Sequence, residues 1–243
     1  MSGPSVAMVM AAGLGLRMRP LTDSRPKALI EVGGKALIDH VLDALEAQGV
    51  ARAVVNVHAF ADQMEAHLAR RRSPEILISD ERAALLETGG GLKASRRFLG
   101  DDPVWVANSD YVWIDQEEDP LGLVARTWDP ARMDACLIVV PKARTQGFGQ
   151  AGDFFRAETG ALTHRGAAAE APYHCIGVEI IDPTLAYAVP DQRFSLFQVW
   201  QAAALRGRLH GVVPSGLWMQ VGDPGALAAA EARLSSASVK ASP

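Results

Sequence analysis

The stretch Val6-Ala-Met-Val-Met-Ala-Ala-Gly-Leu-Gly-Leu-Arg-Met18 decides how the fold begins. The apolar run Ser5–Ala12 has the composition of a strand buried on both faces, which is typical of parallel sheets. Two glycines, Gly13 and Gly15, follow at the carboxyl end of this strand. Glycines at such a position let the backbone approach a phosphate closely and direct N–H groups toward it. The stretch therefore predicts a parallel strand followed by an anion-binding loop.

Strands and helices alternate in the pattern of the first 140 residues. The predicted strands after the first are Ala53–Val57, Ile76–Ser79, Pro103–Ala107 and Cys136–Val140. The predicted helices are Ala36–Gln48, Asp62–Arg71, Gly91–Phe98 and Leu121–Trp128. This alternation indicates an α/β fold, with a Rossmann-like, mostly parallel sheet and helices on both faces.

The pattern changes near residue 142. Two short runs, Phe154–Ala157 and Ala161–Thr163, flank a turn and predict a hairpin, and Tyr173–Ile181 predicts a further strand. We expect this antiparallel region to be inserted on the open side of the sheet. The remaining expected elements are a helix at Phe197–Arg206, strands at His210–Val213 and Leu217–Val221, and a last helix from Asp223 to about Leu234. We expect one domain over residues 1–234 and a flexible tail at 235–243.

Composition narrows the possible partners. The 243 residues include 24 Lys and Arg against 28 Asp and Glu, a net charge of −4 that gives no nucleic-acid signature. No apolar run approaches the roughly 18 residues of a membrane span, and the start lacks a signal-peptide pattern, so we expect a cytoplasmic protein without membrane partners. Residues 1–35 nevertheless hold five basic groups against two acidic ones, which favours a small anion as ligand.

The glycine loop matches neither of two common phosphate-binding motifs. A Rossmann fingerprint requires a small residue where Met18 stands, and a Walker loop requires Ser or Thr where Ala28 follows Lys27. Arg17 and Lys27 still lie in this loop. Because Arg offers a bidentate fork for phosphate and Lys a mobile point charge, the pair favours a triphosphate ligand over a simple tight turn.

The loop also resembles a known signature. Ala11–Leu29 reads A-A-G-x-G-x-R-M-x-P-L-T-x-x-x-P-K-A-L, which resembles the sugar-1-phosphate nucleotidyltransferases, and the similarity continues to about Leu234. Leu86–Gly91 resembles the loop with which this family reads the nucleobase, and Asn108–Asp110 resembles its N-G-D motif. The short chain and the L-E-T-G-G-G loop most resemble the N-acetylmuramate-1-phosphate uridylyltransferases of peptidoglycan recycling.

The resemblance implies roles for particular residues. Asp110 would hold Mg²⁺, Arg17 the leaving pyrophosphate and Lys27 the α-phosphate or the incoming phosphate, so these three are the predicted catalytic residues. No general base is required, because a phosphate monoester is already ionised near neutral pH. The predicted nucleotide-binding residues are Ala11, Ala12, Gly13, Gly15, Arg17, Lys27, Glu81, Thr88, Gly89 and Asn108.

Two regions depart from the family pattern. The family carries W-x-D-x-G-T near the C-terminus, whereas Gln220 stands here at the second metal-ligand position; we expect Gln220 to assist Asp110 and Asp223 to cap the last helix. The predicted sugar-binding residues are Asn56, Gly147 and Gly177. The family's Glu-Lys sugar contacts have no counterpart, since His164 and Arg165 stand nearest to that place.

The expected function is Mg²⁺-dependent nucleotidyl transfer from a nucleoside triphosphate, UTP in the preferred interpretation, to a sugar 1-phosphate such as N-acetylmuramate 1-phosphate. Residues 1–140 would form the nucleotide-binding part and 141–222 the sugar-binding part of a monomer or weak homo-oligomer. Two alternatives stay open: a guanylyl- or thymidylyltransferase acting on mannose, glucose or heptose 1-phosphate, and a non-catalytic protein that binds a nucleotide sugar.

Overall fold

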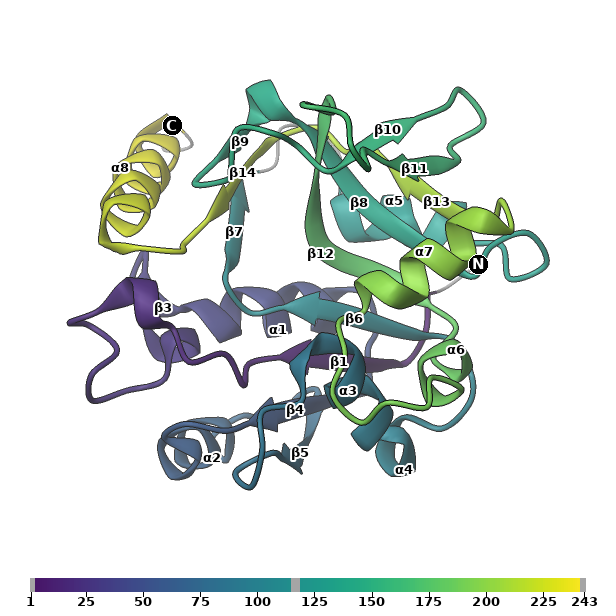
Figure 1. The fold of residues 1–243 in the computed structure, drawn as a ribbon. Helices are drawn as coiled ribbons and strands as arrows, with labels where there is room; N and C mark the ends of the chain where they lie inside the picture. Colours follow the sequence, from purple (N-terminus) through teal and green to yellow (C-terminus); the bar gives the residue numbers. More distant parts are fainter. Residues whose placement is uncertain (1–2, 115–118, 241–243) are drawn as a thin grey trace.

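A central sheet with helices on both faces forms the body of the molecule (Figure 1). The computed structural model describes residues 3–114 and 119–240, with the backbone alone from 237 to 240. Four strands pair in parallel in the order β5 (Glu75–Asp80), β4 (Arg52–Val57), β1 (Val6–Met10) and β6 (Val104–Asn108). The predicted Rossmann-like, mostly parallel arrangement is confirmed for this half of the sheet.

The other half of the sheet is antiparallel. β12 (Tyr173–Ile181) pairs antiparallel with both β6 and β8 (Ala135–Pro141), and β13 (Leu209–Val212) pairs parallel with β8. The hairpin of β10 (Phe154–Arg156) and β11 (Leu162–His164) lies beyond β12. The antiparallel insertion therefore lies where the sequence pattern predicts it.

Alternate side chains of β1 enter two different cores. Ala7 and Val9 pack in the core beneath α1 (Leu37–Ala47), α2 (Ala61–Leu68) and α5 (Pro120–Thr127), whereas Met8 and Met10 pack in the opposite core. The opposite core is covered by α3 (Glu87–Ala94), α4 (Arg96–Leu99), α6 (Thr184–Tyr187) and α7 (Phe197–Leu205). Burial on both faces explains the uninterrupted apolar sequence of this strand.

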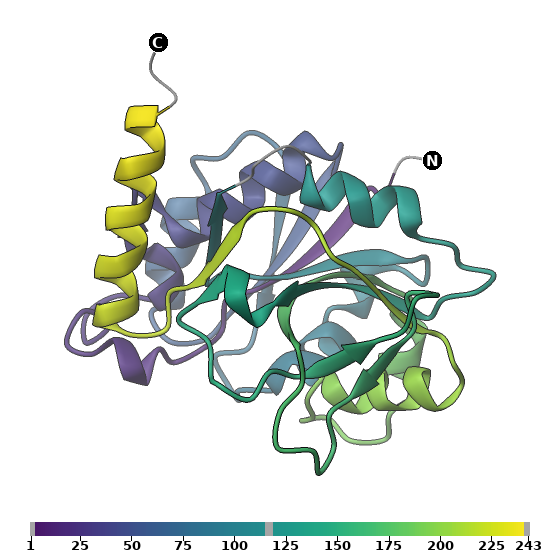
Figure 2. The ribbon, with the colours of Figure 1, turned by 90° about the horizontal axis from the view of Figure 1, so that it is seen from above.

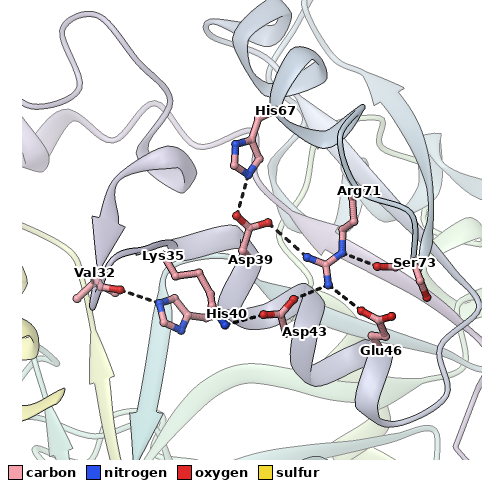
Figure 3. Close-up of polar contacts among 9 residues, drawn as sticks. All are labelled: Val32, Lys35, Asp39, His40, Asp43, Glu46, His67, Arg71 and Ser73. Atoms are coloured by element: carbon pink, nitrogen blue, oxygen red, sulfur yellow. Dashed lines mark hydrogen bonds and ion pairs between the residues drawn. The ribbon is translucent and has the colours of Figure 1, made fainter. Parts of the chain in front are cut away.

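Ion pairs join α1 to α2 on one of these layers (Figure 3). The guanidinium of Arg71, just after α2, contacts the carboxylates of Asp39, Asp43 and Glu46 at 3.4, 2.5 and 3.1 Å. His67 contacts Asp39 at 2.8 Å. These contacts tie the outer surfaces of the two helices together, at a distance in the chain from the signature loop.

A second sheet of three strands was only partly predicted. β14 (Leu217–Gln220) pairs antiparallel with β7 (Tyr111–Ile114) and parallel with β9 (Thr145–Gln146), and only β14 was expected. The short strands β2 (Glu31–Val32) and β3 (Lys35–Ala36) form a separate hairpin. This second sheet carries the C-terminal part of the chain back to the end of β6.

Two predicted helix bounds are wrong. α3 begins at Glu87 rather than at Gly91, because three glycines that lower helix propensity are held there by tertiary contacts. α8 (Pro224–Lys240) continues past the predicted end at Leu234, so residues 235–240 are helical rather than a flexible tail. Its alanine-rich sequence meets no glycine or proline before position 243, and Ser236 donates back to the carbonyl of Ala232. Residues 241–243 lie outside the described residues.

α8 stands at one end of the molecule, away from α6 and α7 (Figures 1 and 2). It packs through Ala230 against Val32, Met219 and Val221, in a third and smaller core. Over the described residues, no helix combines the length and the apolar character that a membrane crossing requires.

Candidate active site

The largest cavity lies where the parallel strands end. It has a volume of about 550 Å³ and opens at the carboxyl ends of β1, β4 and β6, the usual ligand position in open α/β sheets. The predicted site residues that line it are Ala11, Ala12, Gly13, Gly15, Arg17, Lys27, Asn56, Glu81, Thr88, Asn108, Asp110 and Gln220. Segments far apart in the sequence thus meet in one site.

The signature loop is folded tightly on itself. Gly15 has φ of +61°, and a Cβ there would lie 2.9 Å from the Cβ of Lys27 and 3.0 Å from Cγ2 of Thr22. The Thr22 hydroxyl donates to the Gly15 carbonyl at 2.9 Å. Glycine is required at this position both by the backbone conformation and by the close approach. The fold brings Lys27 beside the first turn of the loop.

Lys27 and Asp110 form an ion pair within the cavity. Lys27 Nζ donates to Asp110 Oδ2 at 2.6 Å, and the two side chains are 14% and 20% exposed. Ser109 holds the end of β6 against β1, because its backbone N–H and its hydroxyl both donate to the Met10 carbonyl, at 3.2 and 2.8 Å. Asp110 is therefore presented to the cavity from a fixed strand end.

Gln220 lies at the same edge of the cavity. It is paired with Tyr111 in the second sheet, and its Nε2 donates to the Tyr111 hydroxyl at 3.2 Å. The next residue, Val221, donates its N–H to the Asp110 carbonyl at 2.9 Å. Asp223 Oδ1 accepts the N–H of Ala226 at 2.8 Å at the start of α8, which confirms its predicted capping geometry.

Asn56 and Glu81 lie beneath the cavity floor and are each 3% exposed. Asn56 Oδ1 accepts the N–H groups of Ala11 and Ala12, so these two amides are already engaged within the protein. Asn56 Nδ2 donates to Glu81 Oε1 at 2.8 Å. Burial raises the pKa of Glu81, although hydrogen bonds from Asn56 and the Leu86 N–H act in the opposite direction.

The predicted base loop is fastened to a segment that sequence analysis missed. The N–H groups of Gly89 and Gly90 both donate to the Phe194 carbonyl, at 2.9 and 3.0 Å, and Thr88 Oγ1 accepts the N–H of Leu196 at 2.9 Å. A Cβ on Gly89 would lie 2.3 Å from the Phe194 ring. Gly89 thus lies behind the cavity wall, and its role in nucleotide binding stays a prediction.

A smaller cavity of about 190 Å³ adjoins the first and shares Asn108 and Tyr111 with it. Gly177, a predicted sugar-binding residue, lines it with φ of +64°; a Cβ there would lie 2.1 Å from Asn108 Nδ2. Gly147 lines neither of these two cavities, and packs against the Gln220 carbonyl. The lining residues that sequence analysis did not select are Asp153, Phe154, His164, Cys175, Phe197 and Trp200.

Comparison with known proteins assigns this site to a class. The MobA-like NTP transferase domain matches residues 7–209, from β1 to the start of β13. The chain is therefore a nucleotidyltransferase. It belongs to the MobA-like NTP transferase family, as its resemblance in sequence predicted.

Individual relatives agree with this assignment. The chain is 52% identical over 238 residues to the N-acetylmuramate alpha-1-phosphate uridylyltransferase of Caulobacter vibrioides, covering 96% of this chain and 98% of that protein. It is 30% identical to a mannose-1-phosphate guanyltransferase of Neurospora crassa, covering 90% of this chain and 61% of that protein.

Solved structures share the fold. The inositol-1-phosphate CTP transferase of T. maritima has a TM-score of 0.77 at 16% identity, covering 93% of this chain and 92% of that one. HddC of Yersinia pseudotuberculosis, complexed with GMP-PN, has a TM-score of 0.71 at 18% identity, covering 94% and 99%. These likenesses confirm the predicted fold class.

Proposed function

We propose that the protein transfers a uridylyl group from UTP to N-acetylmuramate α-1-phosphate, giving UDP-N-acetylmuramate and pyrophosphate. The observation that carries this proposal is the 52% identity to the Caulobacter enzyme across nearly the whole of both chains. Residues 1–140 would serve the nucleotide and 141–222 the sugar, which agrees with the positions of the larger and the smaller cavity.

The reaction joins two anions. An oxygen of the sugar phosphate forms a bond to the α-phosphorus, the bond from that phosphorus to the bridging oxygen breaks, and pyrophosphate leaves with the electron pair. Catalysis of such a step is mainly positioning and neutralisation of charge. Lys27 would neutralise the α-phosphate or the incoming phosphate. Arg17, at the cavity edge beside Gly222, would hold the pyrophosphate.

The donor set at the cavity edge fits Mg²⁺. Asp110 supplies a carboxylate, and the bond from Gln220 Nε2 to Tyr111 leaves the amide oxygen of Gln220 available as a second hard ligand. Mg²⁺ would supply further neutralisation of the phosphates when bound. Because one carboxylate is a weak anchor and Lys27 already occupies it, we infer that Mg²⁺ enters together with the triphosphate, whose oxygens complete its ligand set.

A substrate matrix tests the proposal. Pyrophosphate release is measured with UTP, GTP, dTTP and CTP, each combined with N-acetylmuramate, mannose and glucose 1-phosphates. We expect the fastest release with UTP and N-acetylmuramate 1-phosphate. Faster release with GTP and mannose 1-phosphate would replace the proposal by guanylyl transfer. Binding of a nucleotide sugar without release from any pair would indicate a protein that binds but does not turn over.

A further inference from the structure

Asn56 contacts the parts of the cavity that serve the two ends of a nucleotide. Its Oδ1 accepts the N–H groups of Ala11 and Ala12, at 2.7 and 3.3 Å, where the phosphate loop (residues 11–17) begins. Its Nδ2 donates to Glu81 Oε1 at 2.8 Å. Glu81 Oε2 in turn accepts the N–H of Leu86 at 3.3 Å, where the base loop (residues 86–91) begins. One buried side-chain pair therefore joins two loops that belong to different strands.

The surroundings of this pair are built closely around it. A Cβ on Gly91 would lie 2.7 Å from Glu81 Oε1 and 2.9 Å from Asn56 Nδ2, so only glycine leaves room for the pair. His58 Nδ1 lies 2.7 Å from the Glu81 carbonyl and fixes the backbone there. Hydrogen bonds in such a water-poor setting strengthen one another, and an unpaired member is costly.

We propose that Asn56 is a positioning residue that couples the base loop to the phosphate loop through Glu81. The coupling rests on the proposed function only in requiring that a nucleoside triphosphate is a substrate. A triphosphate then meets one preorganised surface, and the entropy of ordering both loops is lost on folding rather than on binding. This role differs from the sugar contact that the sequence predicts for Asn56, because its polar atoms are directed at the two loops.

The hydrogen-bond polarity of the pair makes the proposal testable. The loop amides need an acceptor, and Glu81 needs a donor, so Asn56 must supply both. In Asn56→Asp, two carboxylates would face each other at the 2.8 Å contact. In Glu81→Gln, one amide end would face a donor. In the double variant Asn56→Asp/Glu81→Gln, Gln donates to Asp and accepts from Leu86, so every contact and the net charge are restored.

Calorimetric binding is measured with whichever triphosphate the wild-type protein binds most tightly, so an incorrect base assignment does not affect the test. We expect Asn56→Asp to weaken binding by about tenfold or more, since it unpairs a buried charged group. Glu81→Gln weakens binding less. The double variant binds much more tightly than Asn56→Asp and at least as tightly as Glu81→Gln. Weakening in the double variant equal to the product of the two single effects would overturn the coupling.

Two further readouts separate coupling from other roles. Ser95→Ala is the matched control, because Ser95 Oγ makes a buried 2.9 Å bond to Ser79 Oγ between β5 and the end of α3 without reaching either loop. We expect this control to lower the melting temperature without changing the triphosphate Kd. Steady-state kinetics complete the test: a rise in KM for the sugar phosphate in Asn56→Asp that Glu81→Gln does not reverse would return Asn56 to sugar binding and overturn the proposal.

Discussion

Lys27 Nζ lies 2.6 Å from Asp110 Oδ2, so the cation predicted to contact phosphate neutralises the carboxylate predicted to hold the metal. In the nucleotide-free protein, a divalent cation must compete with this ammonium group. The pair therefore keeps Asp110 neutralised until a substrate phosphate draws Lys27 away, and a divalent cation can then take its place.

This competition predicts an unusual sign for one substitution. Lys27→Met removes the ammonium group but keeps an unbranched side chain, so we expect it to tighten Mn²⁺ binding to the nucleotide-free protein several-fold. Mn²⁺ is used because free and bound ion are distinguished by electron paramagnetic resonance. Arg17→Met is the control, since it removes a cation from the same cavity that makes no ion pair with Asp110. Unchanged or weaker Mn²⁺ binding by Lys27→Met would show that the pair does not exclude the metal.

Turnover should respond in the opposite direction. Arg17→Ala and Lys27→Ala each remove a charge oriented toward phosphate, and we expect each to lower kcat by about 100-fold or more. Melting temperatures report whether the variants remain folded. Near wild-type kcat in either folded variant would remove that residue from the catalytic assignment.

The metal-ligand assignment predicts three different outcomes. Asp110→Asn should abolish most activity, and Gln220→Asp should lower the Mg²⁺ concentration that gives half-maximal rate, because it adds a second carboxylate. Asp223→Asn should keep its activity, because Asp223 caps α8 through Ala226. The measurement is the rate as a function of Mg²⁺ concentration. Loss of activity in Asp223→Asn as severe as in Asp110→Asn, without loss of stability, would place the second ligand at Asp223.

The wall between the two cavities provides a steric test. In Gly177→Ala, the new methyl group would lie 2.1 Å from Asn108 Nδ2, and we expect kcat/KM for the sugar phosphate to fall by about tenfold or more. Gly166→Ala is the matched control, because Gly166 also has a positive φ, of +55°, but has open space around its Cα. Equal effects of the two substitutions would mean that backbone strain, rather than displacement of Asn108, is responsible.

A buried carboxyl group predicts a pH dependence of stability. Glu179, in β12, is 1% exposed, its Oε2 has no hydrogen-bond partner among the described residues, and burial raises its pKa to about 8. Between the ordinary carboxyl pKa and about 8, the folded protein retains a proton that the unfolded chain releases. Stability from this group is therefore full at low pH and declines as pH rises through this range.

Glu179→Gln removes this titration with little change of shape. We expect the variant to gain stability relative to the wild-type protein as pH rises from 5 to about 8, by thermal unfolding in matched buffers. A stability difference that is constant over this range would show that Glu179 is already ionised in the folded protein.

The sequence predicted most of the main sheet because its strands and helices have distinct apolar patterns. β1 reads as an uninterrupted apolar run, and α1 repeats its apolar residues with helical spacing. β7 and β9 were missed because strands of four and two residues are defined by their pairing with β14 rather than by a local pattern.

Site residues were predicted where a side chain carries the chemistry. Arg17, Lys27 and Asp110 lie together as expected. Phe194 was missed because it acts through its carbonyl, which every residue has, and through the packing of its ring on Gly89. The roles expected of the Ala11 and Ala12 amides changed because a distant Asn side chain occupies them, which no local motif encodes.

A competition assay tests the proposed function most directly. Equal concentrations of UTP, GTP and dTTP are mixed with equal concentrations of N-acetylmuramate and mannose 1-phosphates, and the nucleotide sugars formed are quantified by mass spectrometry. The product ratio at early times equals the ratio of kcat/KM values. We predict UDP-N-acetylmuramate as the dominant product. A dominant GDP-mannose peak, or no nucleotide sugar at all, would contradict the proposed function.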